Sequence, residues 1–112
     1  MKIQDKVIQD ILTERQRQDK KWGEQNHPPQ FWTGILGEEF GELCEAINET
    51  VFDNGTDKGG YENMKKEAIH VAAVAVGFLE CLERNFGLNK KAAIINEDFE
   101  KAVRDMEAQN WR

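Results

Sequence analysis

The sequence predicts an all-α protein of one domain, and three observations lead to this fold class. Apolar residues recur three and four positions apart along most of the chain, which is the spacing of one face of an α-helix. Stretches that contain glycine or proline divide this pattern into segments. No segment alternates apolar and polar residues in the manner of a β-strand. We therefore expect residues 1–112 to form a single domain of four helices.

The first two predicted helices are separated by a short loop. Residues 3–21 form the first helix, which is amphipathic in its first half and becomes a polar run in its second. Gly23 and Pro28 interrupt the helical pattern, so residues 22–29 are expected to be a loop. The second helix is expected to begin near residue 30 and to end near residue 52.

The third and fourth predicted helices follow a turn-rich segment at residues 53–60. The third helix is expected over residues 61–86, with Gly87 as a left-handed C-terminal stop. The last helix is expected over residues 89–109, where Asn89 is a possible N-cap.

Composition and charge exclude several classes of protein. The chain is 39% apolar and 32% charged, which is typical of a soluble globular domain. Its net charge of −6 argues against a protein that coats nucleic acid. No segment is apolar enough for a signal peptide or a membrane span, so we expect a cytoplasmic protein without a membrane partner. The two cysteines are expected to be free thiols.

Several acidic residues fall where a helix should be apolar. When the second predicted helix is projected at about 100° per residue, Glu39 falls inside the apolar arc, with Glu38 and Glu42 toward its edge. On the third predicted helix, Glu67 falls in the middle of the apolar face and His70 lies at its margin. Two helices of one small domain therefore each direct a carboxylate toward the core.

A carboxylate in an apolar interior requires a partner, because burial of the ion costs several kcal/mol. Lys65 and Lys66 project away from the face that carries Glu67, so an internal ion pair is poorly supported. A divalent cation would satisfy Glu39 and Glu67 together. The alternative explanation is that these carboxylates are exposed to solvent. For Glu38 we give a metal-related role and simple exposure equal weight.

The acidic residues form two motifs. Glu38-Glu39-Phe40-Gly41-Glu42 is followed, after 24 intervening residues, by Glu67-Ala68-Ile69-His70. This arrangement resembles the paired EExxE and ExxD motifs of the MazG-like nucleoside triphosphate pyrophosphohydrolases, which are related to the dimeric all-α dUTPase- and dCTPase-like enzymes. The resemblance extends from about Glu14 to Leu82. It implies a bundle of four to five helices in which the second and third helices carry a metal site.

The resemblance also implies roles for individual residues. Glu39, Glu42 and Glu67 would bind Mg²⁺, and Glu38 would act as the base that orients or activates water. His70 stands where the family has aspartate. An imidazole ligand suits Mn²⁺ better than Mg²⁺, so Mn²⁺ is a second candidate cofactor. Two interpretations of His70 remain open, a metal ligand and a structural histidine at the edge of the core.

The implied reaction converts a nucleoside triphosphate to its monophosphate and pyrophosphate. Arg15 and Lys21 lie just before the first loop and are candidate ligands of the phosphates, although a mixed-charge helix end is also commonly solvated. Trp22, Asn26 and His27 are candidates for stacking on the nucleobase or hydrogen-bonding to it. Nothing in the sequence selects a particular nucleotide.

Two other classes of protein remain as alternatives. Residues 24–27 and 67–70 both read ExxH, a motif of di-iron carboxylate bundles, but the first copy falls in a predicted loop. A non-catalytic helical module that retains the metal site is the other alternative. Residues 69–79 are apolar nearly all round the helix, so we expect a homodimer or homotetramer under either function.

Overall fold

The computed structural model describes residues 1–53, 55–87 and 96–110, and all regular structure within these ranges is helical. The predicted all-α class is thereby confirmed, as are four helices within the described residues. None of these helices is long and apolar enough to cross a membrane. The predicted start of the last helix, with the Asn89 cap, lies outside the described residues. The helices are α1 (Ile3–Trp22), α2 (Pro29–Phe52), α3 (Tyr61–Phe86) and α4 (Asn96–Asn110).

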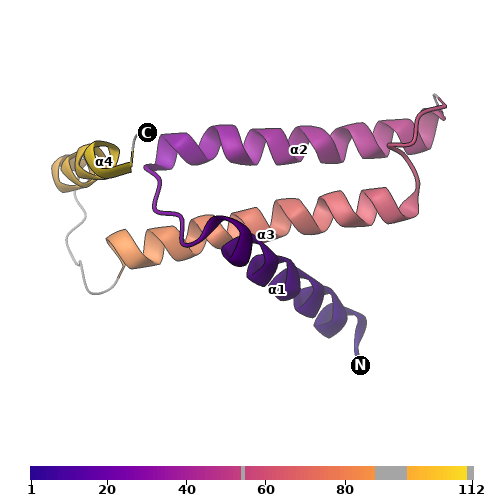
Figure 1. Ribbon diagram of the computed structural model, residues 1–112, viewed down its shortest axis with the longest axis horizontal. Helices are drawn as coiled ribbons and strands as arrows, with labels where there is room; N and C mark the ends of the chain where they lie inside the picture. The colour runs from indigo at the N-terminus through magenta and orange to yellow at the C-terminus, as the bar shows by residue number, and fades with distance from the viewer. Residues whose placement is uncertain (54, 88–95, 111–112) are drawn as a thin grey trace.

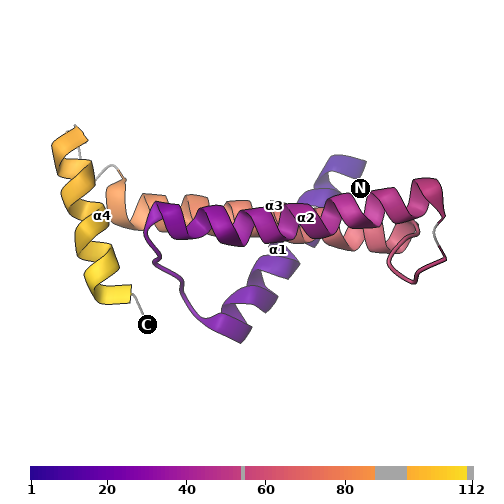
Figure 2. The ribbon, with the colours of Figure 1, turned by 90° about the horizontal axis from the view of Figure 1, so that it is seen from above.

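Helices α2 and α3 form an antiparallel hairpin that is the frame of the molecule (Figures 1 and 2). Helix α1 crosses α3 obliquely, whereas α4 lies at the end of the hairpin where α2 begins and α3 ends (Figure 1). Helix α3 packs against both α1 and α2. Side chains from three helices can therefore meet on α3.

The break between α1 and α2 agrees with the prediction. Gly23 has a φ of 75°, which favours glycine, and its N–H donates to the carbonyl of Asp19 at 2.8 Å. Pro29 occupies the first turn of α2, where the N–H that proline lacks would have no helical partner.

Gly87 ends α3, but not in the predicted left-handed conformation. Its φ is −79°, and its N–H donates to the carbonyl of Glu83 at 3.1 Å. A Cβ at Gly87 would lie 2.4 Å from that carbonyl oxygen. Glycine is therefore required here by a close backbone approach and not by a positive φ.

The turn between α2 and α3 is held by side-chain hydrogen bonds. The hydroxyl of Thr50 donates to the carbonyl of Ala46 at 2.6 Å and accepts from the N–H of Gly60 at 2.7 Å. The Asn63 amide donates to the carbonyl of Gly59 at 2.9 Å. A Cβ at Gly59 would lie 2.8–2.9 Å from the backbone of α2, so the connection passes very close to that helix.

One end of the hairpin contains the hydrophobic core. The buried members of the core come from three helices, and they are Trp32, Val74, Cys81 and Met106. Further along α2, the predicted apolar arc is only partly covered. Phe40, Ile47 and Val51 expose 58%, 40% and 66% of their surfaces, and Leu79 on α3 exposes 59%. The single chain thus buries one stretch of its apolar surface and leaves another in solvent.

The burial of helix α1 is the opposite of what its sequence suggests, which is a buried apolar half and an exposed polar half. Its apolar first half is exposed, as at Val7 and Leu12, whereas the polar second half buries Glu14, Arg15 and Gln18. The reason is the oblique crossing: the N-terminal half of α1 projects away from the hairpin, and the C-terminal half lies against α3 (Figure 1). The alternative of a solvated charge run is therefore wrong for these three residues.

Candidate metal centre

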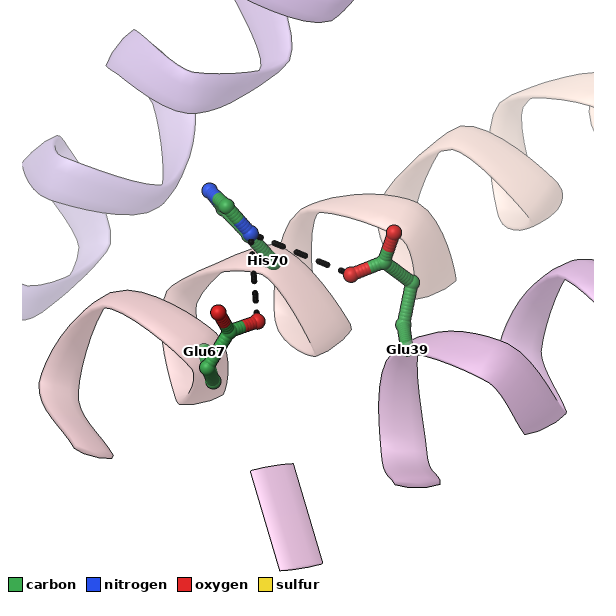
Figure 3. A group of neighbouring side chains, drawn as sticks. All are labelled: Glu39, Glu67 and His70. Carbon is green, nitrogen blue, oxygen red and sulfur yellow. Dashed lines mark ion pairs between the residues drawn. The ribbon is translucent and has the colours of Figure 1, made fainter. Parts of the chain in front are cut away.

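Three predicted ligands converge between α2 and α3. Glu39 extends from α2, and Glu67 and His70 extend from α3 (Figure 3). One ligand atom from each residue lies within 4.8 Å of the others. Glu67 and His70 are three residues apart and share one face of α3, while the antiparallel packing of α2 places Glu39 opposite them.

The oxygen atoms that face one another in this cluster have no hydrogen-bond donor. His70 Nδ1 lies 3.5 Å from Glu67 Oε2 and 3.8 Å from Glu39 Oε2. Both Oε2 atoms are buried, and no group in the described part of the chain donates a hydrogen bond to either of them. A buried acceptor without a donor costs about 1–3 kcal/mol, and more when it is charged. Two carboxylate oxygens and one imidazole nitrogen form a donor set that fits a divalent cation.

Burial and neighbouring charges raise the pKa of two acidic residues in and beside the cluster. Burial raises the pKa of Glu39, His70 acts in the opposite direction, and the charge of nearby Glu67 raises this pKa by a smaller amount. The pKa of Glu42 is also raised, by partial desolvation of this exposed side chain and then by the charges of Glu39 and Glu67. Repulsion among these carboxylates is relieved when a cation binds.

The lysines beside Glu67 behave differently from each other. Lys65 Nζ lies 3.8 Å from Asp10 on α1, so it is directed away from Glu67 as predicted. Lys66 Nζ lies 3.9 Å from Glu67 Oε1, so the prediction that it projects away is wrong for this long side chain. This contact is longer than a hydrogen bond and leaves the other oxygen of Glu67 without a donor.

The other two acidic residues of the motif lie beside the cluster. Glu42 is exposed and is not part of the group formed by Glu39, Glu67 and His70. It lines a surface pocket together with Glu67. Glu38 is also exposed and lines a separate cavity together with Glu39.

This second cavity, with a volume of about 230 Å³, opens between α1, α2 and α3. Its walls include Arg15 and Trp22 from α1, and Trp32, Glu38 and Glu39 from α2. Glu39 belongs both to the ligand cluster and to the cavity wall. A molecule in the cavity would therefore lie next to a cation held by the cluster.

Arg15 is a fixed part of this wall. Its Nη2 donates to Glu80 at 2.5 Å and to Asp19 at 2.8 Å, and its Nη1 donates to Gln18 at 3.0 Å. The guanidinium also lies against Gly77, where a Cβ would come within 3.4 Å of Cζ. These contacts engage both terminal nitrogens, whereas Nε is buried without a hydrogen-bond partner among the described residues. The role of Arg15 as a phosphate ligand stays a prediction.

Lys21 and Trp22 lie together at the end of α1. The Lys21 ammonium is 4.7 Å from the centroid of the Trp22 ring, which is a cation–π contact. Trp22 exposes 52% of its surface and lines the cavity. Trp22 therefore lies where a ligand in the cavity can contact it, and the role of Lys21 stays a prediction.

Asn26 and His27 stabilise the loop, and the cavity is lined without them. The Asn26 side-chain oxygen accepts hydrogen bonds from Arg84 at 3.0 Å and Asn85 at 3.1 Å. The His27 ring stacks on Phe31 at 4.8 Å, and burial lowers the pKa of His27. Neither residue lines the cavity, and their predicted contact with a nucleobase stays a prediction.

Glu14 is the functional candidate that the sequence interpretation missed. It is buried, and its two oxygens accept hydrogen bonds of 2.7 Å from the Arg17 guanidinium. These bonds lower its pKa, and Gln18 donates a further bond at 3.2 Å. Glu14 Oε2 lies 3.6 Å from His70 Nε2. The sequence contains one signal for the burial of Glu14: Ile11, Glu14 and Gln18 are three and four residues apart, so they share one face of the helix.

The segment that the di-iron interpretation requires is not helical. Residues 24–27 lie between α1 and α2, outside any helix. Glu24 pairs at 2.5 Å with Arg84. The first ExxH motif therefore lacks the helical geometry that directs both of its side chains to one metal.

Comparisons with known proteins identify no relative of this chain. No family model matches it, no curated protein matches it, and no solved structure matches it.

Proposed function

We propose that this protein is a metal-dependent pyrophosphohydrolase that converts a nucleoside triphosphate to its monophosphate and pyrophosphate. One observation carries the proposal. The buried Oε2 atoms of Glu39 and Glu67 face His70 Nδ1 without a hydrogen-bond donor, beside a cavity that Glu39 itself lines. The resemblance of the two acidic motifs to those of the MazG-like family supports the same function.

Glu39, Glu67 and His70 would hold the cation, and the exposed Glu42 is a fourth candidate ligand. When bound, a divalent cation neutralises charge on the phosphate oxygens and favours attack by water. Carboxylates suit Mg²⁺, whereas the imidazole of His70 shifts the preference toward Mn²⁺. We therefore expect activity with both ions.

The cavity provides the groups that a nucleotide requires. Trp22 is half exposed and lines the cavity, so the face of its ring opposite the Lys21 ammonium is the one on which a base would stack. Trp32, which is 2% exposed, supports the wall from the core. Lys21, whose ammonium lies 4.7 Å from the centroid of the Trp22 ring, is our candidate for the positive charge that offsets phosphate charge. Glu38 lies on the same wall and is exposed, so it is our candidate base for the attacking water.

A panel assay tests this function. The protein is incubated with canonical, deoxy and modified nucleoside triphosphates in Mg²⁺, Mn²⁺ or EDTA, and pyrophosphate is measured separately from orthophosphate. We expect pyrophosphate release from at least one nucleotide, and its loss in EDTA. Release of orthophosphate alone would contradict cleavage between the α and β phosphates.

A non-catalytic helical module that retains the metal site is the second candidate function. The exposed apolar side chains of Phe40, Val51 and Leu79 favour it, because such surfaces commonly pack against other chains. Metal binding without turnover of any nucleotide in the panel would favour this module over the hydrolase. Metal-dependent pyrophosphate release would exclude it.

A further inference from the structure

The two ring nitrogens of His70 face different carboxylates. Nδ1 faces Glu67 and Glu39, and Nε2 lies 3.6 Å from Oε2 of Glu14 on α1. Figure 3 shows the second nitrogen pointing away from the two labelled carboxylates, toward the ribbon of α1. A neutral imidazole carries a proton on one nitrogen and a lone pair on the other, and only the lone pair can bind a metal.

Glu14 is held in place more firmly than either carboxylate of the cluster. The Nε and Nη2 atoms of Arg17 each donate to a different oxygen of Glu14 at 2.7 Å, and Gln18 donates to Oε2. This bidentate geometry fixes the plane of a carboxylate as well as its position. Glu14 is also only 9% exposed. The acceptor that faces His70 Nε2 is therefore oriented in advance.

We propose that Glu14 is a positioning residue that accepts the Nε2–H of His70 and so directs the Nδ1 lone pair toward the space between Glu39 and Glu67. The inference rests on the proposed metal site and adds a residue from a third helix to it. The Nε2–Oε2 separation is that of an ion pair, and a shift of roughly half an ångström brings it to hydrogen-bond length. The carboxylate behind the imidazole also supplies negative charge that a neutral ligand lacks.

Glu14 also joins α1 to α3. An experiment must therefore distinguish its effect on the His70 imidazole from its effect on the packing of these two helices. The tautomer of His70 makes this distinction. We would record two-bond ¹H–¹⁵N correlations of the metal-free protein at a pH where the imidazole is neutral, with His70→Gln assigning the signals. We expect the Nε2–H tautomer, with an Nε2 proton that exchanges slowly with water. An Nδ1–H tautomer in the wild-type protein would overturn the inference, whatever any variant does.

Two matched variants complete the tautomer experiment. Glu14→Gln removes the acceptor charge but keeps the size of the side chain, and we expect it to lose the single Nε2–H tautomer. Glu80→Gln is the control, because Glu80 is a carboxylate that also joins α3 to α1, through Arg15. It should keep the wild-type spectrum. The same spectrum in Glu14→Gln as in the wild type would contradict a positioning role.

Calorimetric titration with Mn²⁺ alone links the tautomer to the metal. We expect Glu14→Gln to weaken Mn²⁺ binding by about 10- to 100-fold, the usual effect of losing a carboxylate behind a histidine ligand. Glu80→Gln should bind as the wild type does. Unchanged Mn²⁺ affinity in a folded Glu14→Gln protein would overturn this inference alone, whereas no Mn²⁺ binding by the wild type would overturn the metal site itself.

Discussion

At the scale of residues, the unusual feature is a set of buried oxygens without donors. Glu39 and Glu67 each bury an Oε2 atom to which no N–H or O–H group of residues 1–53, 55–87 or 96–110 donates, and His70 lies between them. Uncharged side chains of the same size would lower the free-energy cost of burial at these positions. Such a cost is expected at a functional site, where local stability is given up for ligand binding.

Glutamine at either position separates function from stability. We expect Glu39→Gln and Glu67→Gln each to abolish metal-dependent turnover, because each removes a charged ligand. Both variants should fold, and with equal or greater stability, because each also removes a buried charge. Pyrophosphate release and thermal unfolding measure the two effects. Glu45→Gln is the control, since Glu45 is exposed on the same helix. Unfolding of both variants would contradict the prediction.

The stability of the metal-free protein should depend on pH through Glu39. Burial raises the pKa of this carboxyl, so the folded protein holds the proton more tightly than the unfolded chain does. The free energy of unfolding therefore falls as pH rises from the ordinary glutamate pKa through the raised one. Glutamine does not ionise, so Glu39→Gln escapes this loss.

Urea unfolding in EDTA at several pH values measures this difference. We expect Glu39→Gln to exceed the wild type by about 1–2 kcal/mol at neutral pH, a fraction of the cost of an unpaired buried ion. The difference should disappear below about pH 4, where the unfolded chain also holds the proton. An equal difference at all pH values would show that the Glu39 charge is not its cause.

At the scale of elements, the helices could be predicted because their signals are local. The spacing of apolar residues and the breaks at Gly23 and Pro28 predicted the ends of the first two helices to within a residue or two. The convergence of Glu39, Glu67 and His70 was also predictable, because each projects onto the inner face of its own helix. Contact between them needs only that α2 and α3 pack together.

The burial of α1 could not be predicted in this way. Its apolar half, with Val7 and Leu12, lies exposed, and its polar half buries Glu14 and Arg15. The outcome depends on the angle at which α1 crosses α3, which is a tertiary property and has no local signal. The same crossing angle brings Glu14 close to His70. The contact of Glu14 with the cluster could therefore not be predicted from the sequence either.

The α2–α3 turn provides a test of the local packing. A Cβ at Gly59 would lie 2.8–2.9 Å from the backbone of Glu49 and Thr50, so alanine there must displace main-chain atoms. We expect Gly59→Ala to destabilise the protein by about 1–3 kcal/mol in urea unfolding. Gly34→Ala is the control, because nothing lies within 4 Å of its added Cβ in α2. It should be neutral or stabilising by about 0.5–1 kcal/mol.

At the scale of the whole molecule, the chain leaves much apolar surface uncovered. Phe40, Val51 and Leu79 are each more than half exposed, as is Leu12 on α1. Scattered exposed apolar residues are ordinary, but several large ones along two adjoining helices are typical of a surface that packs against another chain. The predicted homodimer or homotetramer would cover them.

Light scattering after size-exclusion chromatography tests this assembly. We expect a mass of two or four chains for the wild type and a smaller mass for Val51→Lys, which places a charge on the exposed apolar face of α2. Thr56→Lys adds the same charge in the exposed turn and should not change the mass. A monomeric wild-type protein at all concentrations would contradict the predicted assembly.

Both the proposed hydrolysis and the positioning role of Glu14 require that Glu39, Glu67 and His70 bind a divalent cation. Free Mn²⁺ gives a paramagnetic resonance signal that is lost on binding, so titration of the metal-free protein measures the site without any nucleotide. We predict saturable binding by the wild type, competition by Mg²⁺, and loss of binding in Glu67→Gln but not in Glu45→Gln. If the wild type bound no Mn²⁺, or if folded Glu67→Gln bound it equally well, this metal centre would be wrong.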